Sequence, residues 1–198
     1  MIRTENEQAM NVLGISGTPR KNGNSDILLL HALRPFEEAG WEVTLLRLRE
    51  LTVKPCQACE LCSLHGSCAI DDDMHLFYDA FRRCDALIMA TPVYYRNVCS
   101  HLMAMMERHY AVREEQPLAG KPGGAIAVGR GSGGGQAMAL NRIYTWLLSC
   151  GAVCVPGELN GLTAVADEPG DVLKQEKRLR QAQILGENIL QAAEKLRT

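Results

Sequence analysis

The stretch NVLGISGTPRKNGNSDILLLHAL (residues 11–33) joins an apolar run to a helical pattern through a polar loop that contains glycine. Residues 11–16 are a compact apolar run ending in small residues, which predicts a buried β-strand. From Ser25 to Ala39 the apolar residues recur at helical spacing, and Gly40 marks the end of the predicted helix. The stretch therefore predicts the first strand–loop–helix unit of an α/β protein.

The rest of the chain repeats this alternation. Further apolar runs predict strands at 42–48, 85–91, 123–129 and 152–156, and helical patterns occupy 71–84, about 98–111, a segment with apolar residues from 138 to 147, and about 171–196. Almost wholly apolar strands that alternate with helices indicate a parallel sheet covered on both faces. The sequence thus predicts one α/β domain over residues 1–198, a doubly wound, flavodoxin-like, five-stranded parallel sheet of order 2-1-3-4-5.

Composition excludes several classes of function. The 198 residues are 46% hydrophobic and 22% charged, with a formal charge of −2 and no basic stripe, so nucleic acid is not an expected partner. No apolar run reaches the roughly 20 residues that cross a bilayer, so no membrane partner is expected either. The N-terminal segment MIRTENEQAM is polar and lacks the apolar part of a secretory signal, which leads us to expect a cytoplasmic location.

The loop after the first strand, GISGTPRKNGNSD (14–26), combines small polar residues with Gly17 and Gly23 at the start of a helix. A helix N-terminus attracts anions, and small residues let several backbone N–H groups approach one phosphate. The GxxxxGK[ST] pattern of an ATP-binding loop is absent, so a monophosphate such as that of FMN fits better. The alternative is a polar turn in which Asn24 or Ser25 only caps the helix.

Two later loops follow the third and fourth predicted strands. In TPVYYRNV (91–98), Tyr94 or Tyr95 would stack on or shield a flavin ring, or both would simply be half-buried loop residues. GRGSGGGQ (129–136) contains a GxGxxG match, but in the fourth unit and without the expected acidic residue, so we reject a dinucleotide site. Backbone approach to the flavin edge is the preferred interpretation, and a flexible surface loop is the alternative.

A loop at about 54–70 holds four cysteines, Cys56, Cys59, Cys62 and Cys68, in the spacing CxxCxxCx5C. This spacing favours one iron–sulfur cluster, while a zinc site, a redox disulfide and plain structure stay open. His65 within the loop is expected to be solvated, and Asp71, Asp72 and Asp73 to begin a helix. The four remaining cysteines stand among apolar neighbours and are expected to be buried small hydrophobes: Cys84, Cys99, Cys150 and Cys154.

The motifs GxSGTPRKNGNS, CxxCxxCx5C followed by DDDM, TPVYY and GRGSGGGQ, in this order, resemble the iron–sulfur flavoproteins. These are a branch of the flavodoxin-like NAD(P)H-dependent FMN reductase superfamily, and the resemblance covers roughly residues 11–150. The chain departs from many relatives at Ala137, where they carry a glutamate. Cluster-free relatives also keep several cysteines before the DDM-like helix start.

The resemblance implies cofactors and their binding residues. FMN would be held by Ser16, Thr18, Arg20, Asn22, Asn24, Ser25, Pro92, Val93, Tyr94, Tyr95, Asn97, Gly131, Gly134, Gly135 and Gln136. A [4Fe–4S] cluster would be ligated by Cys56, Cys59, Cys62 and Cys68. No acid–base catalytic residue is implied, because the cofactors carry the chemistry.

The resemblance also implies an FMN-dependent oxidoreductase or electron-transfer flavoprotein. It would take electrons from a ferredoxin-like or NAD(P)H donor and pass them to a small-molecule acceptor, in a homodimer or homotetramer. Two alternatives stand beside it: an NAD(P)H-dependent FMN or quinone reductase without a cluster, and a flavin-binding redox sensor.

Overall fold

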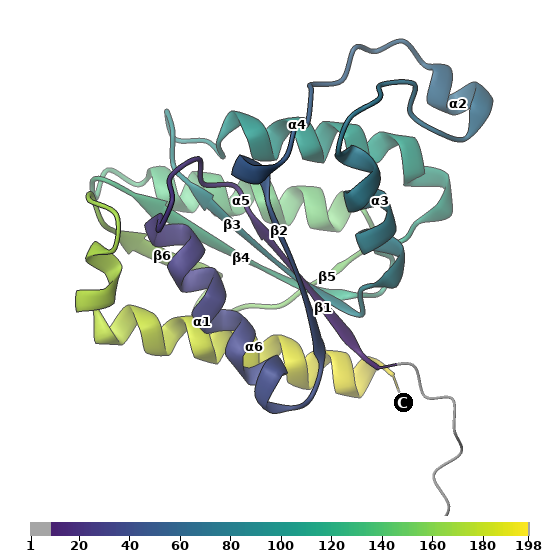
Figure 1. The fold of residues 1–198 in the computed structure, drawn as a ribbon. Helices are drawn as coiled ribbons and strands as arrows, with labels where there is room; N and C mark the ends of the chain where they lie inside the picture. The colour runs from purple at the N-terminus through teal and green to yellow at the C-terminus, as the bar shows by residue number, and fades with distance from the viewer. Residues whose placement is uncertain (1–8, 198) are drawn as a thin grey trace, which may run out of the picture.

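In the computed structural model, which describes residues 9–197, a parallel β-sheet carries helices on both faces (Figure 1). The strands are β1 (Asn11–Ser16), β2 (Glu42–Arg47), β3 (Ala86–Pro92), β4 (Pro122–Gly129), β5 (Val153–Cys154) and β6 (Leu162–Val165). β1, β4 and all but the last residue of β3 are buried, as their apolar sequences require. The polar N-terminal segment discussed above lies largely outside the described residues.

The predicted strand order 2-1-3-4-5 is confirmed, with every pairing parallel. The sheet differs from the prediction at its edge, where two strands instead of one pair with the outer side of β4. β5 pairs only with the start of β4, and β6 pairs with its end, from Ile126 to Gly129. The fifth strand predicted at 152–156 is reduced to the two residues of β5, and β6, the short run LTAV, lies in the stretch that the sequence indicated was polar and without a strand.

The helices form two layers (Figure 1). α1 (Asn24–Glu38) and α6 (Glu176–Leu196) cover one face, while α3 (Met74–Arg83), α4 (Ser100–Arg108) and α5 (Gly135–Ser149) cover the other. α2 (Leu61–His65) lies in the cysteine loop, away from the sheet. Three short 3₁₀ segments complete the fold at Leu48–Glu50, His109–Glu115 and Asp171–Lys174. The last two overlap the end of the helix predicted at about 98–111 and the start of the one predicted at about 171–196.

Close packing of α1 on α6 depends on Gly186. A Cβ atom built at this position would overlap the carbonyl group of Ala32 in α1. Glycine is therefore required where the two helix backbones approach. This contact fixes α1, whose first turn borders the candidate site described below.

The sequence predicted only that the acidic run at 71–73 begins a helix. In the structure the run also accepts hydrogen bonds from the segment before the cysteine loop. Asp72 accepts hydrogen bonds from the N–H groups of Met74 (3.1 Å) and Lys54 (2.9 Å), and Asp73 accepts one from Thr52 N–H (2.6 Å). Burial alone would raise the pKa of Asp72, but hydrogen bonds from Arg108, Lys54 and Met74 outweigh it and hold the pKa below its usual value. The run therefore joins α3 to the segment that leads into the cysteine loop.

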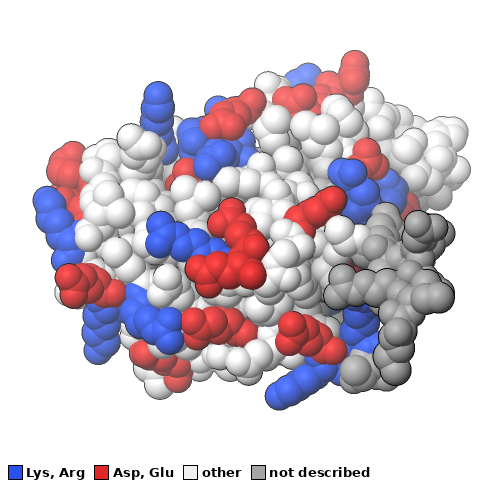
Figure 2. All heavy atoms as spheres, turned by 60° about the horizontal axis from the view of Figure 1, so that its bottom comes forward, with Lys and Arg blue, Asp and Glu red and all other residues white. Residues whose placement is uncertain are grey.

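Charge is well mixed on the face that α6 covers. Lys and Arg side chains of the described residues alternate with Asp and Glu there (Figure 2). Arg180 and Glu187 of α6, for example, form an ion pair of 2.9 Å. Within residues 9–197, none of the helices is both long enough and apolar enough to cross a bilayer.

Candidate functional site

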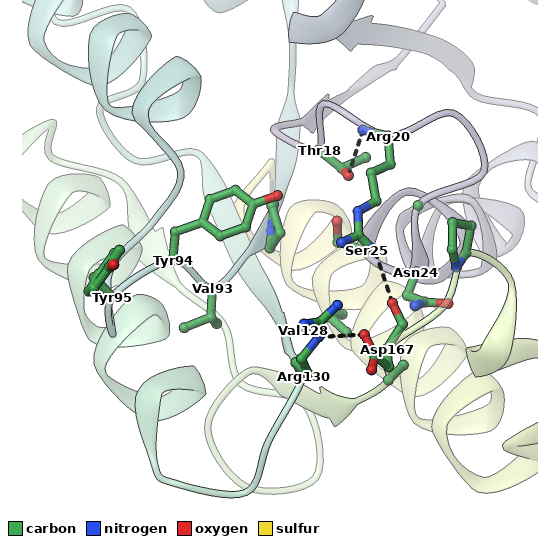
Figure 3. Close-up of a pocket in the computed structure, with 14 residues that line it drawn as sticks. Thr18, Arg20, Asn24, Ser25, Val93, Tyr94, Tyr95, Val128, Arg130 and Asp167 are labelled. Atoms are coloured by element: carbon green, nitrogen blue, oxygen red, sulfur yellow. Dashed lines mark hydrogen bonds and ion pairs between the residues drawn. The ribbon is translucent and has the colours of Figure 1, made fainter.

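A cavity of about 350 Å³ opens at the carboxyl edge of the sheet, where parallel α/β sheets bind ligands (Figure 3). The loops after β1, β3, β4 and β6 surround it. Its lining consists of Thr18, Arg20, Gly23, Asn24, Ser25, Pro92, Val93, Tyr94, Tyr95, Val128, Arg130, Ala166, Asp167 and Pro169. Its volume lies within the range of small-molecule and cofactor sites.

The loop after β1 is shaped by close contacts that place the start of α1 at the cavity. Gly17 N–H donates to the Ala90 carbonyl of β3 (2.8 Å), which holds the loop against the neighbouring strand. A Cβ atom at Gly23 would lie 2.8 Å from Thr18 Cγ2, so glycine is needed immediately before the helix. Thr18 Oγ1 in turn accepts the Arg20 N–H (3.3 Å). These contacts leave the first turn of α1 open to the cavity.

Ser25 gives the clearest indication of which group the cavity could bind. Its side chain is buried with the residue only 1% exposed, it lines the cavity, and its Oγ atom has no hydrogen-bond partner. A buried hydroxyl without a partner is unfavourable by about 1–3 kcal/mol. The N–H groups of a first helical turn also lack partners within the helix. A phosphate at this position would satisfy both, so the residues fit the phosphate of a nucleotide cofactor.

The nearby Asp26 does not oppose an anion at this helix start. Its carboxylate forms ion pairs with Arg47 (3.2 Å) and Arg49 (3.3 Å), and its side chain is only 6% exposed. Its charge is therefore compensated behind the helix. The positive end of the α1 dipole and the Arg20 side chain in the lining both favour a negative ligand.

A tight turn after β3 forms the wall opposite α1. Tyr94 and Asn97 exchange two backbone hydrogen bonds (3.1 and 3.0 Å), and the residues between them, Tyr95 and Arg96, have φ of +48° and +63°. Positive φ is unusual for such large residues, so the surrounding contacts must hold the turn. Figure 3 shows the Tyr94 ring directed toward the cavity and Tyr95 at the outer rim. Tyr95 is fully exposed to solvent.

Of the glycine loop after β4, Arg130 lines the cavity, whereas the residues that the sequence proposed lie behind it. Of the candidate residues Gly131, Gly134, Gly135 and Gln136, none is part of the lining. Gln136 is buried and donates to the carbonyls of Gly131 (2.7 Å) and Ala164 (3.4 Å). A Cβ at Gly135 would lie 3.0 Å from Val93 Cγ1, so this glycine packs under the tyrosine turn.

Three other candidates also lie outside the lining. Ser16 is fully buried and its hydroxyl has no partner, but it does not reach the cavity. Asn22 is exposed with φ of +56°, and Asn97 accepts the N–H of Val98 with its side chain (2.9 Å). The candidates that the structure does bring together at the cavity are Thr18, Arg20, Asn24, Ser25, Pro92, Val93, Tyr94 and Tyr95.

The sequence did not identify the segment after β6, which closes one side of the cavity. Arg20 donates to the Asp167 carbonyl (2.9 Å), and the Asp167 carboxylate pairs with Arg130 (Figure 3). Asn24 donates to the Glu168 carbonyl (2.8 Å) and also accepts the N–H of Val172 (3.1 Å). The four residues LTAV of β6 are too few for a periodic pattern, so local sequence gave no signal for this strand or for the loop after it.

The cysteine loop lies on the surface beside α3 and α4. Cys56 and Cys59 are exposed, and Cys62 and Cys68 are half-buried. Within residues 9–197, no three metal-ligating side chains converge in this conformation. The donor chemistry still suits a cluster, since four thiols occur within one short segment and Ala58 N–H donates to Cys56 Sγ (3.4 Å). Ala58 and Glu60 have φ of +50° and +57°, so the chain turns sharply between the first three cysteines.

The other four cysteines lie outside the loop, where burial disfavours their thiolate forms. Cys84 and Cys99 are buried as predicted, while Cys150 and Cys154 are half-buried. Burial raises the pKa of all four, to about 11 for Cys84 and about 12 for Cys150. Cys99 donates its S–H to the Gly17 carbonyl (2.9 Å), which supports the loop under the cavity.

Comparisons with known proteins agree with this geometry. A sequence profile described as "NADPH-dependent FMN reductase" matches residues 10–164. A protein of Methanocaldococcus jannaschii named an iron-sulfur flavoprotein is 33% identical over 184 residues, which are 91% of this chain and 95% of that protein. One of the same name from Methanosarcina thermophila is 35% identical over 147 residues, or 74% and 77% of the two chains. A WrbA-like flavodoxin from Agrobacterium tumefaciens shares the fold, with a TM-score of 0.68 at 14% identity over 94% of this chain and 99% of its own.

Proposed function

The chain belongs to the NADPH-dependent FMN reductase family and is a flavin-dependent oxidoreductase, and on that premise we propose that the cavity beside α1 binds FMN for electron transfer. FMN, when bound, supplies both hydride acceptance and one-electron exchange. The polypeptide contributes binding, orientation and exclusion of water. The observation that carries the proposal is the buried, unpartnered Ser25 hydroxyl at the open end of α1.

The phosphate is assigned to the α1 side of the cavity. Ser25 Oγ would donate one hydrogen bond, and the N–H groups of the first turn would donate others. Arg20 would add a positive charge from its place in the lining, where it is already held by the Asp167 carbonyl. A charge-assisted hydrogen bond of this kind is about twice as strong as a neutral one.

The flat ring is assigned to the opposite wall. Pro92, Val93, Tyr94 and Tyr95 line this wall, and Val128 adds an apolar surface between the walls. An aromatic side chain and backbone beside a planar ring exclude water from its face. The remaining candidates would act indirectly: Ser16, Asn22, Asn97, Gly131, Gly134, Gly135 and Gln136 would support the loops that the cofactor touches.

We further propose that Cys56, Cys59, Cys62 and Cys68 bind a [4Fe–4S] cluster. Support comes from the thiol donor set and from the name "Iron-sulfur flavoprotein" carried by relatives that are 33% to 36% identical. A cluster exchanges electrons singly, so a protein with both cofactors would link one-electron and two-electron partners. Electrons would come from a ferredoxin-like or NAD(P)H donor and leave to a small-molecule acceptor.

The cluster-free reductase is the second candidate. The family description names NADPH and FMN without a cluster, and no three of the loop thiols converge in the described conformation. In that case the protein would reduce FMN or a quinone with NAD(P)H. Turnover with NAD(P)H and an acceptor would also distinguish either enzyme from a flavin-binding redox sensor.

The experiment that tests the FMN proposal is purification under anaerobic conditions followed by a visible spectrum and FMN quantitation. One FMN per chain is expected, and a protein that stays colourless after incubation with excess FMN would contradict the proposal. Iron and acid-labile sulfide in stoichiometric amounts, with broad absorbance near about 400 nm, are expected if the cluster is present. Cys59→Ala should lose the iron and keep FMN. The matched control Cys154→Ala, outside the loop, should keep both.

The assembly and extent of the protein are part of the same proposal. We expect one FMN-binding domain over 1–198 with the cysteine loop at about 54–70, in a homodimer or homotetramer in the cytoplasm. Light scattering at several protein concentrations tests the oligomeric state. A monomer at all concentrations would contradict it.

A further inference from the structure

Arg108, at the end of α4, is a buried charge that the FMN cavity does not use. Its side chain and that of Asp72 are each 1% exposed. The guanidinium donates two hydrogen bonds to the Asp72 carboxylate, at 2.9 and 3.1 Å. It also donates to the backbone carbonyls of Lys54 (2.9 Å) and Ile70 (3.4 Å). The Arg108 side chain thus binds one carboxylate and two backbone carbonyls from other segments of the chain.

The positions of these acceptors explain what the contacts achieve. Lys54 lies two residues before Cys56, and Ile70 lies two residues after Cys68. Arg108 therefore holds the entry and the exit of the cysteine loop against α4. Asp72 strengthens the same junction, because its carboxylate also accepts the Lys54 N–H (2.9 Å). The loop is closed at its base by side chains from outside the cysteine motif.

Arginine is specifically suited to this junction. Its planar guanidinium presents five N–H donors in a fixed arrangement, whereas lysine presents a single compact charge. A lysine could pair with Asp72 but could not also reach two separated carbonyls. A buried ion pair is costly to desolvate and is often replaceable by apolar residues without loss of stability. Its presence here is therefore better explained by positioning than by stability.

The surroundings of Arg108 connect it to the last cysteine of the loop. Arg108, Tyr78, His75 and Cys68 line a cavity of about 320 Å³, separate from the FMN cavity. Tyr78 O–H donates to the Arg108 carbonyl (3.0 Å), which fixes the end of α4. The Arg108 Nε–H has no partner, so one donor of the buried cation is left over at the base of the loop.

We propose that Arg108 is a positioning residue that, with Asp72, closes the base of the cysteine loop and brings its two ends into the arrangement in which four thiols can receive one cluster. This inference rests on the proposed cluster function. The residue touches no substrate and takes no part in electron transfer. Its effect is to reduce the number of conformations that the loop must lose when it binds iron and sulfide.

The test compares Arg108→Met and Arg108→Lys with the wild-type protein, all loaded with FMN. Arg82→Met is the matched control, because Arg82 also pairs with carboxylates (Glu115 and Asp79) but does not touch the cysteine loop. The first readout is amide hydrogen exchange in cluster-free protein at Thr52, Lys54 and Asp73, whose N–H groups are hydrogen-bonded across the loop base. The second is iron bound per chain after anaerobic reconstitution.

Both Arg108 variants should keep one FMN per chain. Exchange at the three amides should become about tenfold faster or more in Arg108→Met, with a smaller change in Arg108→Lys. Iron uptake should fall severalfold in Arg108→Met and less in Arg108→Lys. Arg82→Met should match the wild type in both measurements. If Arg108→Met does not fold, the double variant Asp72→Asn with Arg108→Met removes the unpaired carboxylate and is measured in its place.

Wild-type exchange at these amides together with wild-type iron uptake would overturn the proposal. Faster exchange with unchanged iron uptake would overturn it as well, because the closed base would then be irrelevant to the cluster. If the wild-type protein itself takes up no iron, the proposed cluster function fails, and the assignment of Arg108 as a positioning residue for it fails with it. In that case unchanged FMN content would show that the FMN proposal stands independently.

Discussion

Replacement of Ser25 by alanine should have two effects of opposite sign. The Ser25 hydroxyl is buried and has no partner in the ligand-free chain. Its removal should therefore stabilise the FMN-free protein, because a buried polar group no longer goes unsatisfied. The same change should weaken FMN binding, because the phosphate would lose a hydrogen bond. A hydroxyl with a purely structural role would not produce this combination.

The magnitudes follow from the burial of the group. Loss of an unsatisfied buried hydroxyl should raise the free energy of unfolding of the FMN-free protein by about 1 kcal/mol. For a chain of this size, that gain corresponds to a Tm increase of about 2–4 °C. A hydrogen bond to a charged phosphate contributes about 1.5–3 kcal/mol, so the Kd for FMN should rise about 10- to 150-fold.

The assay is thermal unfolding of the FMN-free protein together with FMN titration followed by flavin fluorescence. Ser16→Ala is the matched control, because Ser16 is also buried and unpartnered but lies outside the cavity. The control should show the gain in Tm and less than about a threefold change in Kd. Unchanged FMN affinity in Ser25→Ala would refute the assignment of the phosphate to the start of α1.

Three further predictions concern stability and the cavity wall. Gly186→Ala should destabilise the protein by about 1–3 kcal/mol in urea unfolding, because its Cβ would overlap the Ala32 carbonyl; an unchanged urea midpoint would contradict the packing of α6 on α1. Burial lowers the pKa of His109 to about 4, so the unfolded chain binds a proton that the native protein does not between pH 6.5 and 4, and stability should fall across this window as the pH falls. His109→Gln should remove roughly 2–3 kcal/mol of the stability difference between pH 7.5 and 4.5, and an identical pH profile would contradict this. Asp167→Asn breaks the exposed pair with Arg130 and should speed FMN dissociation severalfold in stopped-flow measurements, with less than about 1 kcal/mol change in stability.

Much of the fold could be predicted from the sequence because the central strands are apolar on both faces. The runs at residues 11–16, 85–91 and 123–129 lie within one residue of β1, β3 and β4, and their order in the sheet was predicted as well. The edge of the sheet could not be predicted in the same way. β5 has two residues and β6 four, so neither contains enough residues for a periodic pattern to appear.

In the candidate site, too, the residues in a local sequence pattern could be predicted and those placed by distant contacts could not. Thr18, Arg20 and Ser25 lie in one short stretch of the chain and border the cavity, because a strand–loop–helix unit determines their positions. Arg130 and Asp167 could not be found from local pattern. Their place depends on how β6 pairs with the end of β4, which is a contact between distant segments.

Arg108 illustrates a different limit. In the sequence it is one charged residue near the end of an amphipathic helix, where cations are common. Only the folded chain shows that it is buried and that its partners flank the cysteine loop. Conversely, the glycine loop looked like part of the ligand site, but its candidate residues lie outside the cavity lining, with Gly135 packed against the tyrosine turn, and Arg130 lines the cavity instead.

A comparison of FMN with riboflavin as ligands of the same FMN-free protein tests the central claim most directly. The two differ only in the phosphate, which we assign to Ser25, Arg20 and the first turn of α1. Isothermal titration should show that FMN binds at least about 100-fold more tightly than riboflavin, since several charge-assisted hydrogen bonds depend on that phosphate. Equal affinity for the two ligands, or no binding of either, would contradict the account.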